Sequence, residues 1–236
     1  LLVDEAHGPH FRFHPLLPIP ALESGADAVA QGAHKLIGAF TQASYLHLKG
    51  NLIDRARMKA TFQYLTTTSP SYLLMASLDL ARRQMALQGR ELLEYALGLS
   101  DALRESVNEI PGLYAFGEEA LGRPGADWLD PTKVTITVRE LGITGFQAEA
   151  YLRSRFDIQV ELSDLYNVLV IVSFGNKAED ISKLLGALRA LTDAVAAGEL
   201  PKNLLRAQQY IPDIPRLPEL ALSPRKAVER PWERVP

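Results

Sequence analysis

The sequence predicts an α/β fold in which part of a large domain is followed by a small α+β domain. Three observations support this prediction. The chain opens with apolar residues that run into Asp4, as at the end of a buried parallel strand. A helical pattern occupies Ser71 to Ile110. A β-α-β-β-α order of elements follows between residues 112 and 198, which is typical of a small α+β domain.

Residues 1–111 are expected to form the part of the large domain. The four prolines between His7 and Pro20 predict an ordered loop, and residues 21–24 form at most a short helix. Ser69 and Pro70 are residue types expected where the long helix begins. Gly89 and Gly98 are expected to bend that helix. The expected strands span Leu1 to Asp4, Asp27 to Gln31 and Ala43 to Leu48, and a further helix spans Ile53 to Tyr64.

Residues 112–198 are expected to form the small α+β domain. A Gly/Pro/Asp-rich loop covers residues 117–131, and Thr144 is expected to cap the helix that follows the first strand. Residues 199–236 hold seven prolines and predict an extended tail or the start of another domain. The expected strands span Val134 to Val138, Ile158 to Leu162 and Leu165 to Ser173, and the helices Thr144 to Phe156 and Ala178 to Ala197.

Composition excludes several classes of protein. The 236 residues are 47% hydrophobic and 22% charged, with a formal net charge of −3, so neither nucleic acid nor a membrane is expected as a partner. The chain has no cysteine, which excludes disulfides and thiolate metal sites and agrees with a cytoplasmic location. Because a strand is expected at the first residue, which is not Met, we expect an internal fragment of a longer protein.

The segment Asp4-Glu5-Ala6-His7 matches the acidic box of DEAH-type helicases, in which the two acids manage Mg²⁺ and water. That interpretation is disfavoured because the chain lacks the arginine-rich motif that should follow. A different pairing involves Asp4, which ends an expected strand, and Lys35, which follows another strand after a short turn. Their separation suits one strand–connection–strand unit, which would bring both side chains to one edge of a sheet.

Pyridoxal phosphate (PLP) chemistry uses such a pair. A lysine amine binds the cofactor as a Schiff base, the internal aldimine, and a carboxylate keeps the pyridine nitrogen protonated. Spacing alone does not establish this role, because an isolated lysine after a turn is more often simply exposed to solvent.

Several motifs resemble the catalytic half of the Orn/Lys/Arg decarboxylases, a family of fold-type-I PLP enzymes. In chain order these are VDEAHGPHFRFHPLLP, GADAVAQGAHKLIGAFTQASYLHLKG, TTTSPSYLLMASLDLAR and DPTKVTITVRELGITGF. The resemblance continues through VELSDLYNVLVIVSFG to LSPRKA, which is similar to the join to that family's C-terminal domain. It covers nearly the whole chain.

The resemblance implies the C-terminal part of a PLP fold-type-I large domain, then the small domain. It implies PLP-dependent decarboxylation of a basic amino acid, with arginine to agmatine favoured over lysine or ornithine. It also implies a homo-oligomer, a dimer or higher, with a shared active site. Two alternatives stay open: a catalytically impaired or truncated paralogue that acts in binding or assembly, and an oxoamine-synthase-like PLP acyltransferase.

The resemblance also implies roles for individual residues. Lys35 carries PLP, Asp4 pairs with the pyridine nitrogen, and His7 contacts the phenolic oxygen. His34 lines the pocket near the phosphate and the substrate. The stretch Thr67, Thr68 and Ser69 lies near the active site and reaches towards the partner subunit's cofactor.

One position departs from the family pattern. Gly32 stands where the family usually has a serine that hydrogen-bonds the phosphate, so one donor, with a contribution of about 1–2 kcal/mol, is lost unless another group replaces it. His7, His10 and His14 do not predict a metal site, because the neighbouring prolines disfavour a helix; His10 and His14 are expected to pack the loop. Glu161 and Asp164 are either solvated or directed at a basic substrate side chain.

Overall fold

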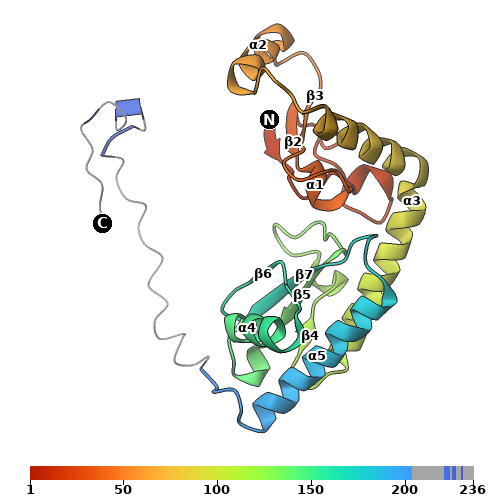
Figure 1. The fold of residues 1–236 in the computed structure, drawn as a ribbon, viewed down its shortest axis with the longest axis vertical. Helices are drawn as coiled ribbons and strands as arrows, with labels where there is room; N and C mark the ends of the chain where they lie inside the picture. Colours follow the sequence, from red (N-terminus) through yellow and green to blue (C-terminus); the bar gives the residue numbers. More distant parts are fainter. Residues whose placement is uncertain (204–220, 224, 227–229, 231–236) are drawn as a thin grey trace.

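The computed structural model describes residues 1–203, 221–223, 225–226 and 230. It contains two β-sheets that are connected by the long helix α3 (Figure 1). The expected tail at residues 199–236 lies largely outside the described residues. In the part of the chain that is described, no helix combines the length and apolar character needed to cross a membrane.

The first sheet has the order β1-β2-β3 and contains the three strands expected before residue 50. Strands β1 (Leu2–Asp4) and β2 (Ala28–Gln31) are parallel, whereas β3 (Tyr45–Leu48) is antiparallel to β2. Pairing continues beyond β1, because the N–H of Glu5 donates to Ala30 and that of Gly32 to Ala6. A 3₁₀ turn (Phe11–Phe13) interrupts the proline-rich loop, and the short helix α1 (Ala33–Leu36) follows β2.

Helices α2 (Arg55–Leu65) and α3 (Tyr72–Asn108) occupy the two expected helical regions. The expected start of α3 at Ser69 and Pro70 is wrong by two residues. Ser71 is the N-cap, and its hydroxyl accepts the N–H of Leu74 at 3.4 Å, a bond that Ser69 is too far upstream to make. Helix α2 contains no buried residue.

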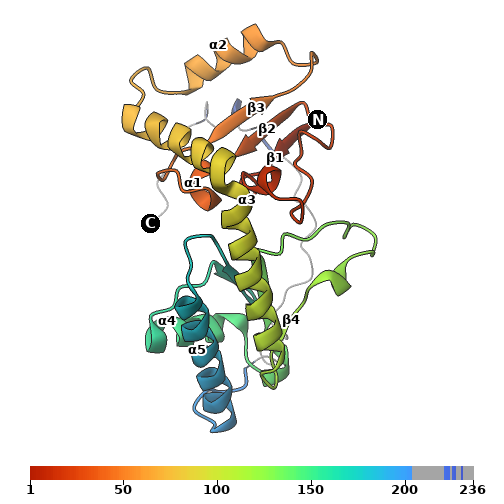
Figure 2. The same cartoon turned by 90° about the vertical axis from the view of Figure 1, so that its right-hand side faces the viewer.

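Helix α3 belongs to both hydrophobic clusters of the structure. Its first half, with Ala81 and Met85, packs against α1 and the loops that adjoin the first sheet. Its second half, with Leu103 and Val107, packs on the second sheet. The helix is continuous but changes direction on the way (Figure 2). At Gly89 it approaches the 3₁₀ turn so closely that an added Cβ would lie 3.1 Å from Cβ of Phe13.

The second sheet has the order β4-β5-β7-β6, with all neighbours antiparallel. Its buried residues alternate along β5 and β7, and α4, α5 and the second half of α3 cover that face. Thr144 caps α4 through a capping box with Gln147, as predicted. The elements are β4 (Tyr114–Ala115), β5 (Lys133–Thr137), α4 (Gly145–Phe156), β6 (Leu162–Ser163), β7 (Asn167–Ile171), α5 (Ala178–Ala196) and two 3₁₀ turns, Glu118–Ala120 and Arg139–Leu141.

The expected strand from Ile158 to Leu162 is wrong. Regular pairing is confined to Leu162 and Ser163, because Asp157 first turns the chain with a left-handed backbone at φ 53°. The strand expected from Leu165 also begins later, at Asn167, since Asp164 holds a tight turn before it. The division of the chain into domains at residues 111 and 112 stays a prediction.

Candidate active site

Lys35 lies just beyond the carboxyl end of β2. The strand ends at Gln31, Gly32 is the N-cap of α1, and Lys35 is in that helix with an exposed side chain. A Cβ at Gly32 would lie 3.1 Å from Cδ of Lys35 and 3.0 Å from the carbonyl oxygen of Ala6. Glycine at this position therefore leaves room for the lysine stem as it lies here.

Asp4 ends β1, where it is paired with Ala30 of β2. Its side chain is exposed, and its Oδ1 accepts the N–H of Ala6 at 3.0 Å. Because β1 and β2 are parallel, Asp4 and Lys35 belong to the same carboxyl edge of the first sheet, which is where α/β proteins usually place ligands. The structure thus confirms the strand–connection–strand unit expected between these two residues.

A polar network that the sequence did not predict lies behind this edge. Glu5 accepts the N–H of Ala21 at 2.8 Å and Nε2 of Gln31 at 2.6 Å. The Oε1 of Gln31 contacts Nε2 of His47 at 2.9 Å. Glu5 and Gln31 directly follow and precede site residues, so this network fixes the backbone from which Asp4 and Gly32 extend.

His34 has one ring nitrogen engaged. Its Nδ1 lies 2.9 Å from the carbonyl oxygen of Ala43, which assigns a proton to Nδ1. The backbone N–H of His34 donates to the same carbonyl at 3.3 Å. This turn therefore fixes the orientation of the imidazole beside Lys35.

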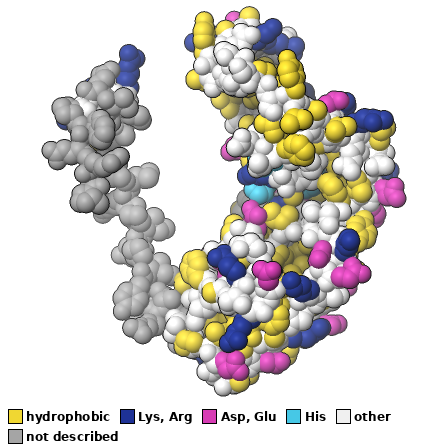
Figure 3. Space-filling view, in the orientation of Figure 1, with side chains coloured by type: hydrophobic (Ala, Val, Ile, Leu, Met, Phe, Trp, Pro, Cys, Tyr) yellow, Lys and Arg dark blue, Asp and Glu magenta, His cyan; other side chains and the backbone are white. Residues whose placement is uncertain are grey.

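His7 follows β1 by three residues and is half-buried. Burial lowers the pKa of its imidazole, and the positive charges of Lys35 and Lys133 lower it further, whereas Glu161 and Asp130 oppose that change. Within the described residues, its buried Nδ1 has no hydrogen-bond partner. Figure 3 shows a histidine in the hollow between the upper and lower parts of the molecule, with basic and acidic side chains nearby.

Asp130 was not expected at the site. Its carboxylate accepts the Thr132 hydroxyl at 2.6 Å and the Lys133 ammonium at 3.0 Å, and Nε2 of His10 lies 3.3 Å away. Burial raises the pKa of Asp130, but His10, Lys133 and Thr132 outweigh burial and hold that pKa far below its usual range. His10 and His14 are both buried in the loop, as expected, and Nε2 of His14 lies 2.7 Å from the carboxylate of Glu94.

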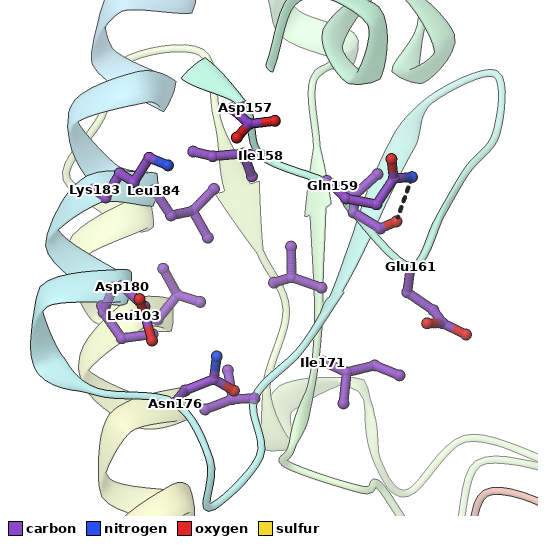
Figure 4. A pocket seen from close by; sticks show the side chains of 14 residues that line it. Leu103, Asp157, Ile158, Gln159, Glu161, Ile171, Asn176, Asp180, Lys183 and Leu184 are labelled. Atoms are coloured by element: carbon purple, nitrogen blue, oxygen red, sulfur yellow. Dashed lines mark hydrogen bonds between the residues drawn. The ribbon is translucent and has the colours of Figure 1, made fainter. Parts of the chain in front are cut away.

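The two acids proposed to face a substrate differ. Asp164 accepts the backbone N–H groups of Tyr166 and Asn167 at 2.7 and 2.8 Å, so it stabilises a turn. Glu161 is exposed and, through its charge, raises the pKa of His7. It lies at the rim of a hollow of about 400 Å³ between α5 and the second sheet, and its carboxylate points away from the other labelled side chains (Figure 4). No residue assigned to PLP lines that hollow.

Thr67, Thr68 and Ser69 are exposed in the connection between α2 and α3. The N–H of Ser69 donates to Oγ1 of Thr67 at 3.1 Å, within the stretch itself. Their role at a partner subunit's cofactor stays a prediction.

The residues fit PLP at the ring and at the lysine. Lys35 and Asp4 are exposed at one sheet edge, and Nδ1 of His7 lacks a partner in the described part of the chain. The fit on the phosphate side is weaker. The N–H of Gly32 cannot replace the missing serine hydroxyl, since it already donates to Ala6 at 3.1 Å.

Comparisons with known proteins identify the family. Residues 1–180 match the model of the Orn/Lys/Arg decarboxylase major domain. The chain is 46% identical to an arginine decarboxylase of Halalkalibacterium halodurans and 43% identical to one of Bacillus subtilis. In both comparisons the match covers 100% of this chain and 47% of the relative, so the chain spans about half the length of these relatives.

Solved structures of lysine decarboxylases have a similar fold. The constitutive lysine decarboxylase of Escherichia coli superposes with a TM-score of 0.68 at 26% identity, over 87% of this chain and 34% of that one. Lysine decarboxylase A of Pseudomonas aeruginosa has a TM-score of 0.71 at 23% identity, over 83% and 33%, and shows the same fold. The predicted fold, a part of PLP fold type I, is thus confirmed, and the chain belongs to the Orn/Lys/Arg decarboxylase family.

Proposed function

We propose that this protein is a PLP-dependent decarboxylase of a basic amino acid, with arginine, converted to agmatine, as the favoured substrate. One observation carries the proposal: parallel strands bring Lys35 and Asp4 to one sheet edge in a chain that is 46% identical to an arginine decarboxylase. Lysine decarboxylases are also among the relatives, but at 30% identity, which supports the preference for arginine. The cytoplasmic location expected from the sequence stays a prediction.

Each site residue has a defined task in this proposal. PLP, when bound, supplies an electron sink when the bond from the α-carbon to the carboxylate breaks and CO₂ leaves. The Lys35 amine would hold the cofactor covalently and would be released when the substrate amine takes its place. The Asp4 carboxylate keeps a proton on the pyridine nitrogen. A neutral His7, favoured by its lowered pKa, retains a ring nitrogen that can accept a hydrogen bond.

Labelling of Lys35 tests the cofactor assignment. With added PLP, the protein should show the visible absorbance of lysine-bound PLP, and borohydride reduction should fix the label on Lys35. Lys35→Ala should abolish both signals. Lys49→Ala is the matched control, because Lys49 also follows a strand but donates to the carbonyl oxygen of Leu22. Label on Lys49, or unchanged absorbance in Lys35→Ala, would refute the assignment.

CO₂ release from arginine, lysine and ornithine tests the reaction. Release from arginine above the other two confirms the favoured substrate. Lysine-bound PLP without CO₂ release from any of the three amino acids identifies the impaired paralogue. Condensation of an amino acid with an acyl donor identifies the acyltransferase alternative.

We also infer that a second copy of the chain covers the exposed surface of α2 and the first half of α3. Helix α2 has no buried residue, and the groove on α3 (about 640 Å³) has apolar walls. Leu73, Leu80 and Leu87 line this groove and are 74%, 61% and 70% exposed, an unusual concentration of apolar surface. The connection that holds Thr68 and Ser69 joins these two helices, which suits a shared site.

Sedimentation velocity tests this interface. Leu80→Glu should shift the oligomer to monomer, because it places a charge in the apolar groove. Leu162→Glu makes the same change at a leucine that is 51% exposed on the second sheet and should leave the oligomer intact. A wild-type protein that is monomeric at micromolar concentration would contradict the inference.

A further inference from the structure

A buried contact joins the segment before α3 to the segment after it. His10, 1% exposed, lies in the loop of residues 5–14, called the histidine loop below, which also carries His7. Its Nε2 is 3.3 Å from Oδ2 of Asp130, which lies just before β5 of the second sheet. The two atoms are within ion-pair distance, but among the described residues neither ring nitrogen of His10 meets the geometry of a hydrogen bond. The contact therefore joins the second sheet to the loop that carries His7 of the candidate cofactor site.

We propose that Asp130 is a positioning residue that docks the histidine loop on the second sheet through His10 and so sets the surroundings of His7. The docking is independent of the proposed function. Its consequence for the cofactor rests on that function.

Asp130 is itself held firmly by the second sheet. Its Oδ1 accepts the N–H of Thr132 at 3.0 Å and the hydroxyl of the same residue at 2.6 Å. The carbonyl of Thr132 then accepts the N–H of Val172 at 2.8 Å, which extends the pairing of β5 with β7. Both carboxylate oxygens are engaged, since Lys133 donates to Oδ2 at 3.0 Å. Asp130 is therefore a fixed anchor.

The histidine loop is tightly turned, so a constraint at His10 reaches His7. The N–H of Gly8 donates to Glu5 at 2.9 Å, that of Phe11 to Gly8 at 3.1 Å, and that of Phe13 to His10 at 3.1 Å. Gly8 is buried, and a Cβ there would lie 2.8 Å from the ring of Phe11. These consecutive turns leave little freedom between the two histidines.

Docking also brings the charges of the second sheet to His7. Lys133 and the nearby Lys35 disfavour the imidazolium, whereas Glu161 and Asp130 favour it. Three of these four groups, Lys133, Glu161 and Asp130, come from the segment after α3. If the loop were released, His7 would lose burial and the influence of Lys133 together.

NMR titration tests the docking without substrate or cofactor. The chain has five histidines, so ¹³C labelling of histidine gives few signals, and each is assigned by substitution. His10→Phe keeps a ring but removes the contact with Asp130, and the pKa of His7 should rise towards its ordinary value. His10→Gln returns an amide donor and should reverse most of that rise. His14→Phe is the matched control, because His14 is a buried histidine of the same loop that pairs with Glu94 of α3.

A double-mutant cycle separates docking from direct electrostatics. Asp130→Asn should change the pKa of His7 by different amounts in the wild type and in His10→Phe. Equal changes, or a pKa of His7 that His10→Phe leaves unaltered in a folded protein, would overturn the proposal. Circular dichroism confirms that each variant is folded.

The consequence for the cofactor is measured separately. His10→Phe should raise the dissociation constant of PLP about fivefold, the effect expected when one hydrogen bond at the site is lost. If Lys35 binds no PLP in the wild type, the proposed function fails while the titration still decides the docking.

Discussion

Gly145 gives the sharpest test of the structure, because helix propensity and packing predict opposite signs for Gly145→Ala. Alanine is favoured over glycine within a helix by up to about 1 kcal/mol. In the structure, however, a Cβ at Gly145 would lie 2.5 Å from the carbonyl oxygen of Asp164 and closer still to that of Asn167. Real Cβ atoms keep at least 3.0 Å, so α4 or the β6–β7 turn must move by about 1 Å to clear the carbonyl oxygen of Asn167.

Because the opposing atoms are backbone, the cost of this overpacking lies at or above the upper end of about 1–3 kcal/mol. The net loss is then about 2 kcal/mol, which lowers Tm by about 4–8 °C for a chain of this size. Urea and thermal unfolding followed by circular dichroism measure it. Gly98→Ala and Gly186→Ala are matched controls: both glycines are helical with no atom within 4 Å of an added Cβ, and should gain about 0.5–1 kcal/mol. A Gly145→Ala protein stabilised like these two would refute the packing.

Three further predictions concern stability, each measured by urea unfolding. Leu152→Ala should cost about 2–5 kcal/mol of unfolding free energy, because Leu152 is fully buried in the hydrophobic cluster of the second sheet. Leu162→Ala, at a 51% exposed leucine, should change that free energy by less than about 0.5 kcal/mol, and similar losses in the two variants would contradict the core assignment. Thr144→Ala should cost about 1 kcal/mol through loss of the capping box, and an unchanged midpoint would exclude that cap. The lowered pKa of Asp130 stabilises the folded state above the unfolded pKa of about 3.9, and this stabilisation is lost as pH falls from there towards the folded pKa. The difference in unfolding free energy between wild type and Asp130→Asn should therefore become smaller from pH 6 to pH 3. A constant difference would disprove the buried ion contacts.

Local patterns predicted most of the regular elements. The alternation around Val134 to Val138 identified β5, and Thr144 identified the start of α4, because both signals lie within a few neighbouring residues. Elements too short to repeat a pattern were missed, such as the four-residue helix α1 and the two-residue strand β4. The strand expected at Ile158 to Leu162 failed because an alternation of apolar and polar residues does not reveal whether a partner strand is within reach.

The sequence by itself determined the family motifs, the strand–connection–strand unit between Asp4 and Lys35, and the departure at Gly32. These are properties of short segments, for which order along the chain is enough. Only the tertiary structure decided that the charges of Asp130, Lys133 and Glu161 act on the pKa of His7, and that Gln31 and Glu5 support the sheet edge through hydrogen bonds. Those contacts depend on how α3 packs against two separate cores. Packing is set by the summed burial of many distant side chains, which no local pattern contains.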